Sequence, residues 1–317
     1  MDQEAGSQTT DGRSVVVCAY TEQRWERLCA AVASAETQLA VNDEIVLVID
    51  TNPDLLDRAK KHFTGATVVA NDSNRGLSGA RNTGVHTATQ PIIVFLDDDA
   101  EALPGWLDAL TAPFEDPNVV GTGGLVIPAW AHHAPPSWFP DEFNWVVGCS
   151  YRGLRKEPGP IRNPIGCNMA FRRSVVTAAG GFADALGRKG TTPVGGEETD
   201  LAIRARTDTG GVVWYSPSAA VLHHVDGERT TLSYFMRRCV AEGHSKARIA
   251  NRVGTVNATA SERRHLITLA RGLPTRLKAA LNERRVEPLT QAAVLVAGTA
   301  ATGVGFVMEG ITSRWMR

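Results

Sequence analysis

Three consecutive carboxylates, Asp97, Asp98 and Asp99, follow directly on the apolar run 92–96. The β-branched and aromatic residues of this run are typical of a buried strand. Like charges crowded at the end of a core strand repel one another and lose hydration unless a positive group lies beside them. A divalent cation is the usual partner, because Mn²⁺ and Mg²⁺ prefer carboxylate oxygens. The alternative is a solvated acidic turn, in which Asp98 or Asp99 caps the helix predicted near residues 104–110.

A second group of carboxylates stands where another helical pattern begins, in the run Gly-Gly-Glu-Glu-Thr-Asp at residues 195–200. Acidic residues in a first helical turn interact favourably with the helix dipole, which is the purely structural interpretation. Carboxylates can also act as general acids or bases where they lie within hydrogen-bond reach of a reacting proton. Gly195 and Gly196 would let a substrate approach the backbone closely.

Buried strands and amphipathic helices alternate around the first of these groups. Strands are predicted at residues 14–20, 44–50, 66–70 and 92–97, and helices at 22–39 and 53–62, with a glycine-rich loop at 74–82 that runs into a further helix. This alternation predicts a doubly wound, mostly parallel α/β sheet. Ligands of such sheets bind outside the carboxyl ends of the strands. Tyr20, Asp50 and Asp97–Asp99 all fall at strand ends, so we expect them to share one site.

Regular patterning weakens after residue 110. Residues 128–164 are rich in proline and hold three of the seven tryptophans, Trp130, Trp138 and Trp145. A loop of this length is usually functional or disordered, and its tryptophans could form a wall that stacks on a substrate. The alternative is that they pin the loop to the sheet. Further on, the pattern predicts a strand and a helix from residue 164, a helix over 195–206, and short strands at 212–215 and 219–224.

The composition is that of a soluble globular protein, with 43% hydrophobic and 21% charged residues among 317. The five cysteines are scattered without a Cys-x-x-Cys pair. They therefore predict reduced thiols in the cytoplasm, and argue against a disulfide framework or a zinc site. Residues 1–13 are polar; we predict a disordered tail there and no signal peptide.

The net charge of −1 conceals two oppositely charged parts. Residues 1–228 carry 18 Lys and Arg against 29 Asp and Glu, whereas residues 229–317 carry 15 against 5. We therefore predict an α/β catalytic domain at 14–228 and a basic helical region at 229–317. No charged residue occurs in the segment 288–308, which has about the ~20 residues that a membrane-spanning helix needs.

The basic region has three open interpretations. Cations that precede an apolar segment suit the anionic cytoplasmic face of a membrane, where the segment could span the bilayer or lie on it. The third interpretation is a helical cap that packs on the catalytic domain and leaves its arginine face in solvent.

Taken in order, these pieces resemble a family 2 glycosyltransferase of the GT-A fold over residues 15–225. The matching motifs are Ala19-Tyr20, the strand ending in Asp50, Asn74 with Ala80-Arg81-Asn82, Leu96-Asp97-Asp98-Asp99, Gly166-Cys167-Asn168-Met169-Ala170-Phe171-Arg172, Gly196-Glu197-Glu198-Thr199-Asp200-Leu201 and the strand ending in His223. The resemblance implies inverting transfer of a sugar from a nucleoside-diphosphate sugar to an acceptor hydroxyl, with Mn²⁺ or Mg²⁺ as cofactor. The Gln-x-x-Arg-Trp signature of processive synthases is absent, which favours a single transfer.

The resemblance also implies roles for individual residues. Donor binding is implied for Ala19, Tyr20, Glu22, Asp50, Arg75, Arg81, Asp97, Asp98 and Gly196, metal binding for Asp97, Asp99 and His223, catalysis for Glu198 as general base with Glu197 beside it, and acceptor contact for Trp138, Trp145 and Asp200. Asp50 would accept the imino N–H of uracil, and a carboxylate there disfavours cytosine, which presents no such N–H. For Asp200, helix capping is an equal alternative.

Two departures from the family pattern bear on these roles. Residues 19–22 read Ala-Tyr-Thr-Glu where many relatives have Pro-x-Tyr-Asn, and Glu197-Glu198 stands where many have Glu-Asp. The longer side chain of Glu198 changes the reach of the base.

Two rival functions stay open, a nucleotidyltransferase and a non-catalytic module that binds a nucleotide sugar. The first would favour a glycine-rich, basic first loop, whereas residues 19–24 contain no glycine. An intact set of acids argues against the second. We expect a UDP-sugar as donor and no nucleic-acid partner. If the basic region binds the cytoplasmic face of the membrane, a polyprenyl-linked or other cell-envelope acceptor is expected.

Overall fold

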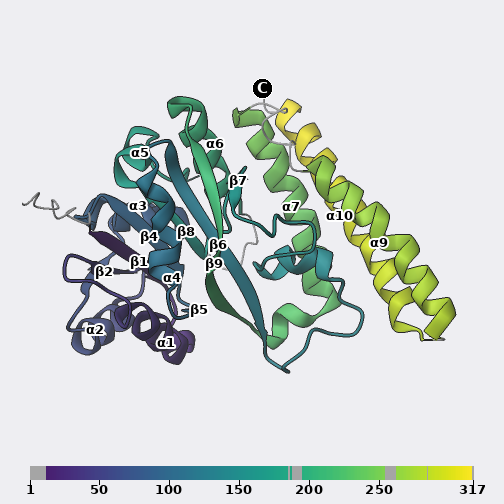
Figure 1. Cartoon of the computed structure of the whole chain (residues 1–317), viewed down its shortest axis with the longest axis horizontal. Helices are drawn as coiled ribbons and strands as arrows, with labels where there is room; N and C mark the ends of the chain where they lie inside the picture. Colours follow the sequence, from purple (N-terminus) through teal and green to yellow (C-terminus); the bar gives the residue numbers. More distant parts are fainter. Residues whose placement is uncertain (1–11, 185, 188–194, 254–261, 284, 316–317) are drawn as a thin grey trace, which may run out of the picture.

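The computed structural model describes residues 12–184, 186–187, 195–253, 262–283 and 285–315. Within these residues, nine strands form one sheet in the order β3-β2-β1-β4-β8-β6-β9-β5, with β7 paired to β9 (Figure 1). The strands are β1 (Arg13–Ala19), β2 (Glu44–Ile49), β3 (Thr67–Ala70), β4 (Ile92–Asp97), β5 (Ala100–Ala102), β6 (Val119–Trp130), β7 (Gly159–Ile161), β8 (Asn168–Arg172) and β9 (Val212–Val225). All pairs among β3, β2, β1 and β4 are parallel, as is β6 with β9, whereas β8, β5 and β7 run antiparallel to their neighbours. The predicted doubly wound, mostly parallel sheet is confirmed.

Helices cover both faces of the sheet, and successive side chains along a strand point to opposite layers. The helices of this part of the chain are α1 (Trp25–Glu36), α2 (Pro53–His62), α3 (Leu77–Thr87), α4 (Trp106–Thr111), α5 (Arg173–Ala178) and α6 (Glu197–Thr209). Val15 and Val17 of β1 belong to the layer with α1, α2 and α4, whereas Val16 belongs to the layer with α3, α5 and α6. The sheet is therefore buried on both faces, and the charged residues predicted to form the site lie at strand ends and in the segments that follow them.

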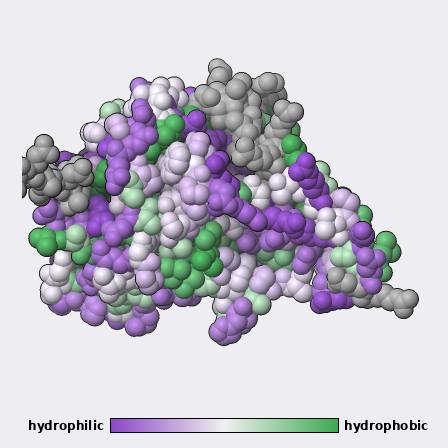
Figure 2. Space-filling view, viewed as in Figure 1, coloured by the Kyte–Doolittle hydropathy of each residue, from purple (hydrophilic) through white to green (hydrophobic). Residues whose placement is uncertain are grey.

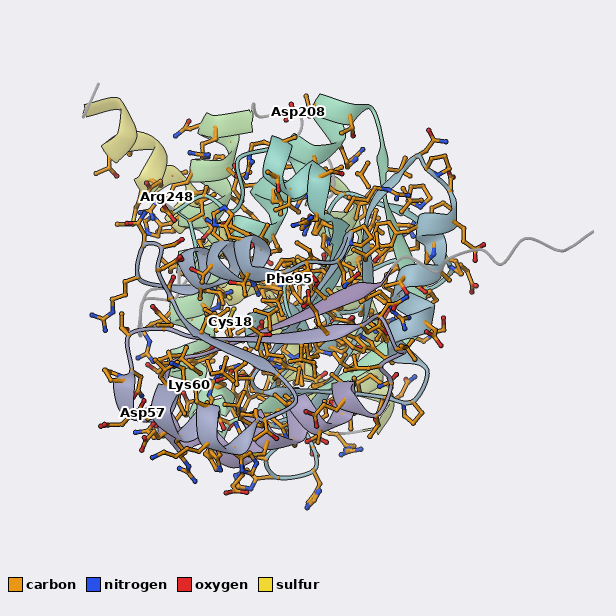
Figure 3. All side chains as sticks on the ribbon, turned by 90° about the vertical axis from the view of Figure 1, so that its left-hand side faces the viewer. Cys18, Asp57, Lys60, Phe95, Asp208 and Arg248 are labelled. Carbon is orange, nitrogen blue, oxygen red and sulfur yellow. The ribbon has the colours of Figure 1, made fainter. Side chains whose placement is uncertain are left out.

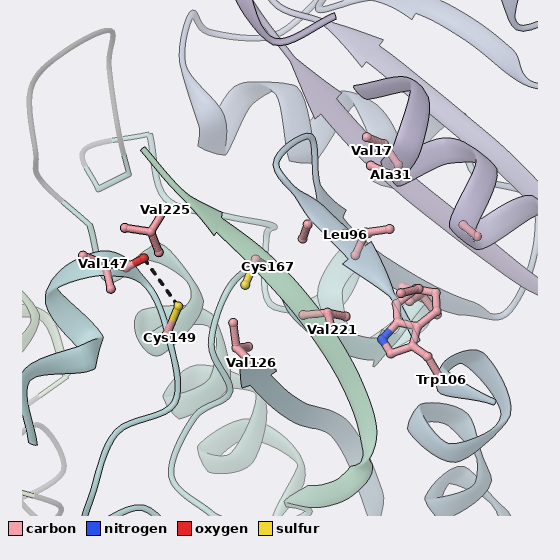
Figure 4. Packing of buried hydrophobic residues seen from close by; sticks show 14 of the residues in the cluster. Val17, Ala31, Leu96, Trp106, Val126, Val147, Cys149, Cys167, Val221 and Val225 are labelled. Carbon is pink, nitrogen blue, oxygen red and sulfur yellow. Dashed lines mark hydrogen bonds between the residues drawn. The ribbon is translucent and has the colours of Figure 1, made fainter. Parts of the chain in front are cut away.

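The interior is apolar with a few paired polar groups. Trp106 is fully buried and donates its indole N–H to Asn168 Oδ1 at 2.8 Å. Figure 4 shows Trp106 among the buried residues of its layer. In the side view of Figure 3, Phe95 lies inside the molecule while Asp57 and Lys60 point outward from α2.

One predicted boundary is wrong, because residues 212–215 and 219–224 belong to a single strand, β9. Polar residues and Pro217 interrupt the apolar pattern between them. Both halves nevertheless pair with β6, and the register shifts between Gly124 and Leu125, so a bulge absorbs the extra residues. Strands β5, β6 and β7 were not predicted.

The segment 128–164 is partly ordered. Its start belongs to β6, which ends at Trp130, and it contains the 3-10 helix η3 (Asp141–Val147) and β7. Of the predicted disordered tail 1–13, residues 1–11 lie outside the described residues. Arg13 already belongs to β1, where its guanidinium pairs with Asp43.

Three long helices follow β9: α7 (Leu232–Val253), α9 (Glu262–Glu283) and α10 (Glu287–Trp315), which lie together on one side of the sheet (Figure 1). Phe235 and Cys239 of α7 belong to the same core cluster as β1 and β4. The predicted domain boundary after residue 228 stays a prediction, and the apolar core runs across it. Glycines let α7 and α10 approach closely, since a Cβ added to Gly243 would lie 2.1 Å from the carbonyl oxygen of Thr302.

The outer faces of α9 and α10 are apolar and exposed. The exposed apolar residues there are Ile267, Leu277, Leu281, Leu289, Val296, Val304, Phe306, Val307, Met308 and Ile311. Figure 2 shows hydrophobic residues at the right-hand edge of the molecule, where these helices lie. Among the described helices, α10 is long and apolar enough to cross a membrane by length and composition. Only 28% of its apolar stretch is buried inside the protein.

A buried ion pair ties α9 to the tryptophan-rich segment. Nη1 and Nη2 of Arg276 donate to the two carboxylate oxygens of Glu142 in η3, at 2.8 and 2.6 Å. The basic region therefore packs on the rest of the protein, as the cap interpretation predicts. Its outer face is apolar and exposed, as the membrane interpretation requires.

Candidate active site

A cavity of about 880 Å³ opens at the carboxyl ends of β1, β2 and β4, within the range of cavities that hold small molecules. The site residues predicted from sequence that line it are Ala19, Tyr20, Asp50, Arg75, Arg81, Asp97, Asp98, Asp99, Trp145, Gly196, Glu197, Glu198 and His223. They come from strand ends of one sheet edge and from the first turn of α6. The expected meeting of these residues at one site is therefore what the structure shows.

Three predicted site residues do not line this cavity. Glu22 lies exposed in the 3-10 helix η1 (Glu22–Arg24). Trp138 packs against Phe139 and Phe235, so it pins its loop to α7. Asp200 is fully buried.

Asp200 serves neither of its two predicted roles. Its carboxylate accepts hydrogen bonds from Arg204 Nε at 2.8 Å and from Arg252 Nε at 3.0 Å. The residue that caps α6 is Gly196, at a φ of +99°, with no side-chain hydrogen bond. Asp200 therefore joins α6 to the end of α7.

Asp50 presents an oriented carboxylate beside an exposed ring. Its Oδ1 accepts a hydrogen bond from Asn71 Nδ2 at 2.8 Å, and its Oδ2 accepts one from the backbone N–H of Gly76 at 3.0 Å. Tyr20 follows the end of β1 and is 44% exposed. This corner can receive a flat group with an N–H donor.

Arg81 of α3 holds the two acidic groups together. Its Nη2 lies 3.0 Å from Asp97 Oδ1, and its Nη1 lies 2.8 Å from Glu197 Oε1. Nη2 also donates to the carbonyl oxygen of Gly166 at 3.0 Å. Because the guanidinium is buried among these acceptors, Arg81 fixes the strand end against the first turn of α6.

Asp98 and Asp99 are 4% and 3% exposed, so the interpretation of a solvated acidic turn is wrong. Arg24 Nη1 lies 3.0 Å from Asp98 Oδ1 and 3.0 Å from Asp99 Oδ2. Arg229 Nη2 adds a contact of 3.2 Å to Asp99 Oδ2. Asp98 Oδ2 is buried without a hydrogen-bond partner in the described part of the chain. Burial, reinforced by Asp99, raises the pKa of Asp98 to about 7.

Asp99 and His223, two of the predicted metal ligands, are in contact. His223 Nε2 lies 3.3 Å from Asp99 Oδ1, and Cys149 Sγ lies 3.6 Å from His223 Nδ1 on the other side of the ring. Burial lowers the pKa of His223, but Asp99 outweighs it and raises that pKa to about 10. Among the described residues, no three His, Cys, Asp or Glu side chains form a ready cluster for a metal ion. Asp97 is the third predicted ligand, and its Oδ1 lies 3.0 Å from Arg81 Nη2.

The two glutamates at the start of α6 differ in their surroundings. Glu197 is 4% exposed and bound to Arg81, and its Oε2 has no hydrogen-bond partner among the described residues. Glu198 is partly exposed on the cavity wall. Burial and the charge of Glu197 raise the pKa of Glu198 to about 8. The carboxylate form of Glu198, which can accept a proton, therefore predominates only above about pH 8.

Several cavity residues were missed from the sequence. Arg24 and Arg229 neutralise the strand-end acids, and Arg238, Glu242 and Lys246 of α7 form part of the wall. The three α7 residues are four positions apart, which places them on one helical face. This spacing can be seen in the sequence and could have identified them as a group. For the two arginines, no local pattern pointed to the acids.

Comparisons with known proteins agree with the resemblance. Residues 14–179 match the model of the family described as glycosyl transferase family 2. A glucosyl-dolichyl phosphate glucuronosyltransferase from Haloferax volcanii is 36% identical over 237 residues, which are 74% of this chain and 75% of that protein.

Two solved structures show the same fold at low identity. A mannosyltransferase from Pyrobaculum calidifontis, solved with GDP-Man and Mn²⁺, has a TM-score of 0.59 at 17% identity, covering 93% of this chain and 86% of that chain. GalNAc-T7, solved with UDP, GalNAc and Mn²⁺, has a TM-score of 0.53 at 19% identity, covering 75% of this chain and 50% of that chain.

Proposed function

The chain belongs to glycosyl transferase family 2 and has the GT-A fold, and from this premise we propose that it moves one sugar from a nucleoside-diphosphate sugar to an acceptor hydroxyl with inversion. The observation that carries the proposal is the partly exposed carboxyl of Glu198, which shares one cavity with Asp50 and the Asp99–His223 pair. Such a transfer needs a general base, a hydrogen-bond acceptor that binds the nucleobase, and a site that stabilises negative charge on the leaving group.

The donor is proposed to be a UDP-sugar. Asp50 accepts two hydrogen bonds from the protein, and its oxygens still have lone pairs for the imino N–H of uracil. The ring of Tyr20 would lie against the base, a contact worth about 1–3 kcal/mol where nucleic-acid bases stack on aromatic side chains. Guanine also presents an N–H, so a GDP-sugar is the competing donor.

Asp99 and His223 would hold Mn²⁺ or Mg²⁺. A carboxylate and a neutral imidazole suit Mn²⁺, so His223 would release its proton when the cation binds. A site with few protein ligands leaves room for substrate oxygens and water. When bound, the cation neutralises negative charge on the departing diphosphate. Arg24 and Arg229 lie against the same carboxylate and can share that task. Arg81 keeps Asp97 and Glu197 in place.

Glu198 is proposed to take the proton from the acceptor hydroxyl as it attacks the anomeric carbon. One base suffices for a single in-line displacement. Glu197 is less suited because one of its oxygens is bound to Arg81. Gly195 and Gly196 line the cavity directly before the two acids, where the backbone lets the sugar come close.

The acceptor is proposed to be a sugar linked to a polyprenyl phosphate, at the cytoplasmic face of the membrane. The name of the Haloferax volcanii relative supports this acceptor class. The exposed apolar faces of α9 and α10 support membrane contact, with the cations Arg271 and Lys278 on α9 suited to an anionic leaflet.

A direct test is the release of free nucleoside diphosphate from a panel of nucleotide sugars, with Mn²⁺ and a lipid-linked acceptor. Thermal shift with Mn²⁺ and each donor would first select the nucleotide. The proposal expects metal-dependent release and a glycosylated acceptor. Binding of donors without release in any combination would instead support the non-catalytic module.

A further inference from the structure

We propose that α7 forms the acceptor side of the cavity, and that Arg238 and Lys246 bind the phosphate that links the acceptor sugar to its lipid. The inference rests on the proposed glycosyl transfer and names the residues that would recognise a phosphorylated acceptor. Within the described residues, α7 is the helix of the basic region that lines the cavity.

The charged side chains of α7 face the cavity in one row. Arg238, Glu242 and Lys246 are four residues apart, so they lie one above the other on the helix. Arg238 Nη2 lies 3.9 Å from Glu242 Oε2, and Lys246 Nζ lies 3.6 Å from Glu242 Oε1. Two cations share one carboxylate, so this wall carries a net positive charge.

The same face of α7 lies against the turn that carries the proposed base. The backbone N–H of Gly195 donates to Ser245 Oγ at 3.2 Å, and a Cβ added to Gly196 would lie 2.7 Å from Ile249 Cδ1. The charge of Glu242 is among the influences that raise the pKa of Glu198. An acceptor hydroxyl held at Glu198 therefore places the next group of the acceptor alongside α7.

Trp145 supplies an aromatic surface at the same place. It lines the cavity, and Lys246 Nζ lies 5.9 Å from its ring centroid. A sugar ring on this indole would have its linking phosphate near the Lys246 ammonium. Of the two tryptophans predicted to contact the acceptor, Trp145 is the one in position to do so.

The opposite face of α7 leads to the apolar helices. Val240 and Gly243 pack against α10, where a Cβ added to Gly305 would lie 2.1 Å from the carbonyl oxygen of Val240. Val240 lies roughly half a helical turn from Arg238, and Gly243 lies between Val240 and Lys246 on the helix surface. The phosphate site thus lies between the polar cavity and the exposed apolar surface, as an acceptor with a charged head and a lipid tail requires.

The test compares two probes on the full-length protein with Mn²⁺ and nucleoside diphosphate present. One probe is glucose linked through phosphate to a short isoprenyl chain, and the other is octyl glucoside, which lacks the phosphate. We expect the parent to bind the phosphorylated probe at least ~10-fold more tightly, as hydrogen bonds to charged groups suggest. Arg238→Gln and Lys246→Met should each reduce this preference by about 10-fold.

Three further variants and readouts decide the outcome. Lys60→Met, on the exposed surface of α2 outside the cavity, should leave the preference unchanged, and Lys246→Arg should keep most of it. The proposal is overturned if both probes bind alike, if the preference survives in Arg238→Gln and Lys246→Met, or if these variants weaken both probes equally. Release of nucleoside diphosphate by the parent tests the transfer reaction by itself, so its failure would count against the proposed function and not against this site alone.

Discussion

Replacing Glu198 by glutamine removes the proposed base and keeps the size and polarity of the side chain. Loss of a general base typically lowers the rate by about 10²–10⁴-fold. We expect that loss in kcat, with donor affinity changed no more than a fewfold, because the assigned donor contacts lie at Asp50, Tyr20 and the metal pair. The assay is the initial rate of nucleoside diphosphate release with Mn²⁺ and acceptor at saturation.

The raised pKa of Glu198 makes the same prediction testable by pH. Below its pKa of about 8 the carboxyl is protonated and cannot accept a proton, so activity should be lost as the pH falls. Two pH units below the pKa only about 1% of the carboxylate remains, and kcat/KM should lie ~100-fold below its plateau. In Glu198→Gln this acidic limb should vanish. Glu197→Gln removes the neighbouring charge that helps to raise the pKa, so there the limb should move to lower pH.

The same variants distinguish Glu197 from Glu198 as the base. If Glu198→Gln turns over within a fewfold of the parent and keeps the acidic limb, while Glu197→Gln does not turn over, then Glu197 is the base. A limb that keeps its position in Glu197→Gln would show that the charge of Glu197 does not act on Glu198.

Other expectations concern the metal site, the buried ion pair and the outer helices. Asp99→Ala should abolish Mn²⁺-dependent nucleotide binding with the far-UV circular dichroism spectrum retained, and unchanged nucleotide affinity in a Mn²⁺ titration would rule out the assignment. Glu142→Gln removes the buried carboxylate beside Arg276 and leaves Asp141, 3.2 Å from Nη2, as its remaining charge partner. The free energy of unfolding, measured by urea denaturation, should fall by about 1–3 kcal/mol; an unchanged value would show that the Arg276–Glu142 pair does not stabilise the fold. Co-sedimentation with anionic vesicles should weaken with salt yet persist at high salt, because apolar burial is not screened. Leu277→Asp with Leu281→Asp should make it fully salt-sensitive, and binding that ignores both changes would exclude α9 as the contact.

The outer helices show where patterns in the sequence were informative and where they were not. The uncharged segment and the basic flank could be found by counting, and they fall on α10 and α9 as long helices. Counting could not tell that α10 would also pack on α7 through Gly243 and Gly305. Truncation of α10 would therefore expose apolar surface on α7 as well as remove the membrane-facing residues, and point changes on the exposed face are the cleaner test.

The strand β9 illustrates a different limit. Its two apolar halves flank Pro217, and local pattern alone favours two strands. Pairing with β6 along both halves makes it one strand with a bulge. That pairing depends on residues nearly a hundred positions away, which no local window contains.

The class of the sheet and the location of the site follow from patterns in the sequence. Alternating strands and helices are local patterns, and the carboxyl ends of parallel strands must meet at one edge, so Tyr20, Asp50 and Asp97 were bound to be neighbours. The charges that oppose these acids, and the glutamate that remains available, depend on tertiary contacts. Arg24, Arg229 and the α7 row reach the cavity from distant parts of the chain, and Arg81 binds Glu197 rather than Glu198. Such pairings depend on distances of a few ångströms between side chains, and neither residue type nor spacing along the chain specifies them.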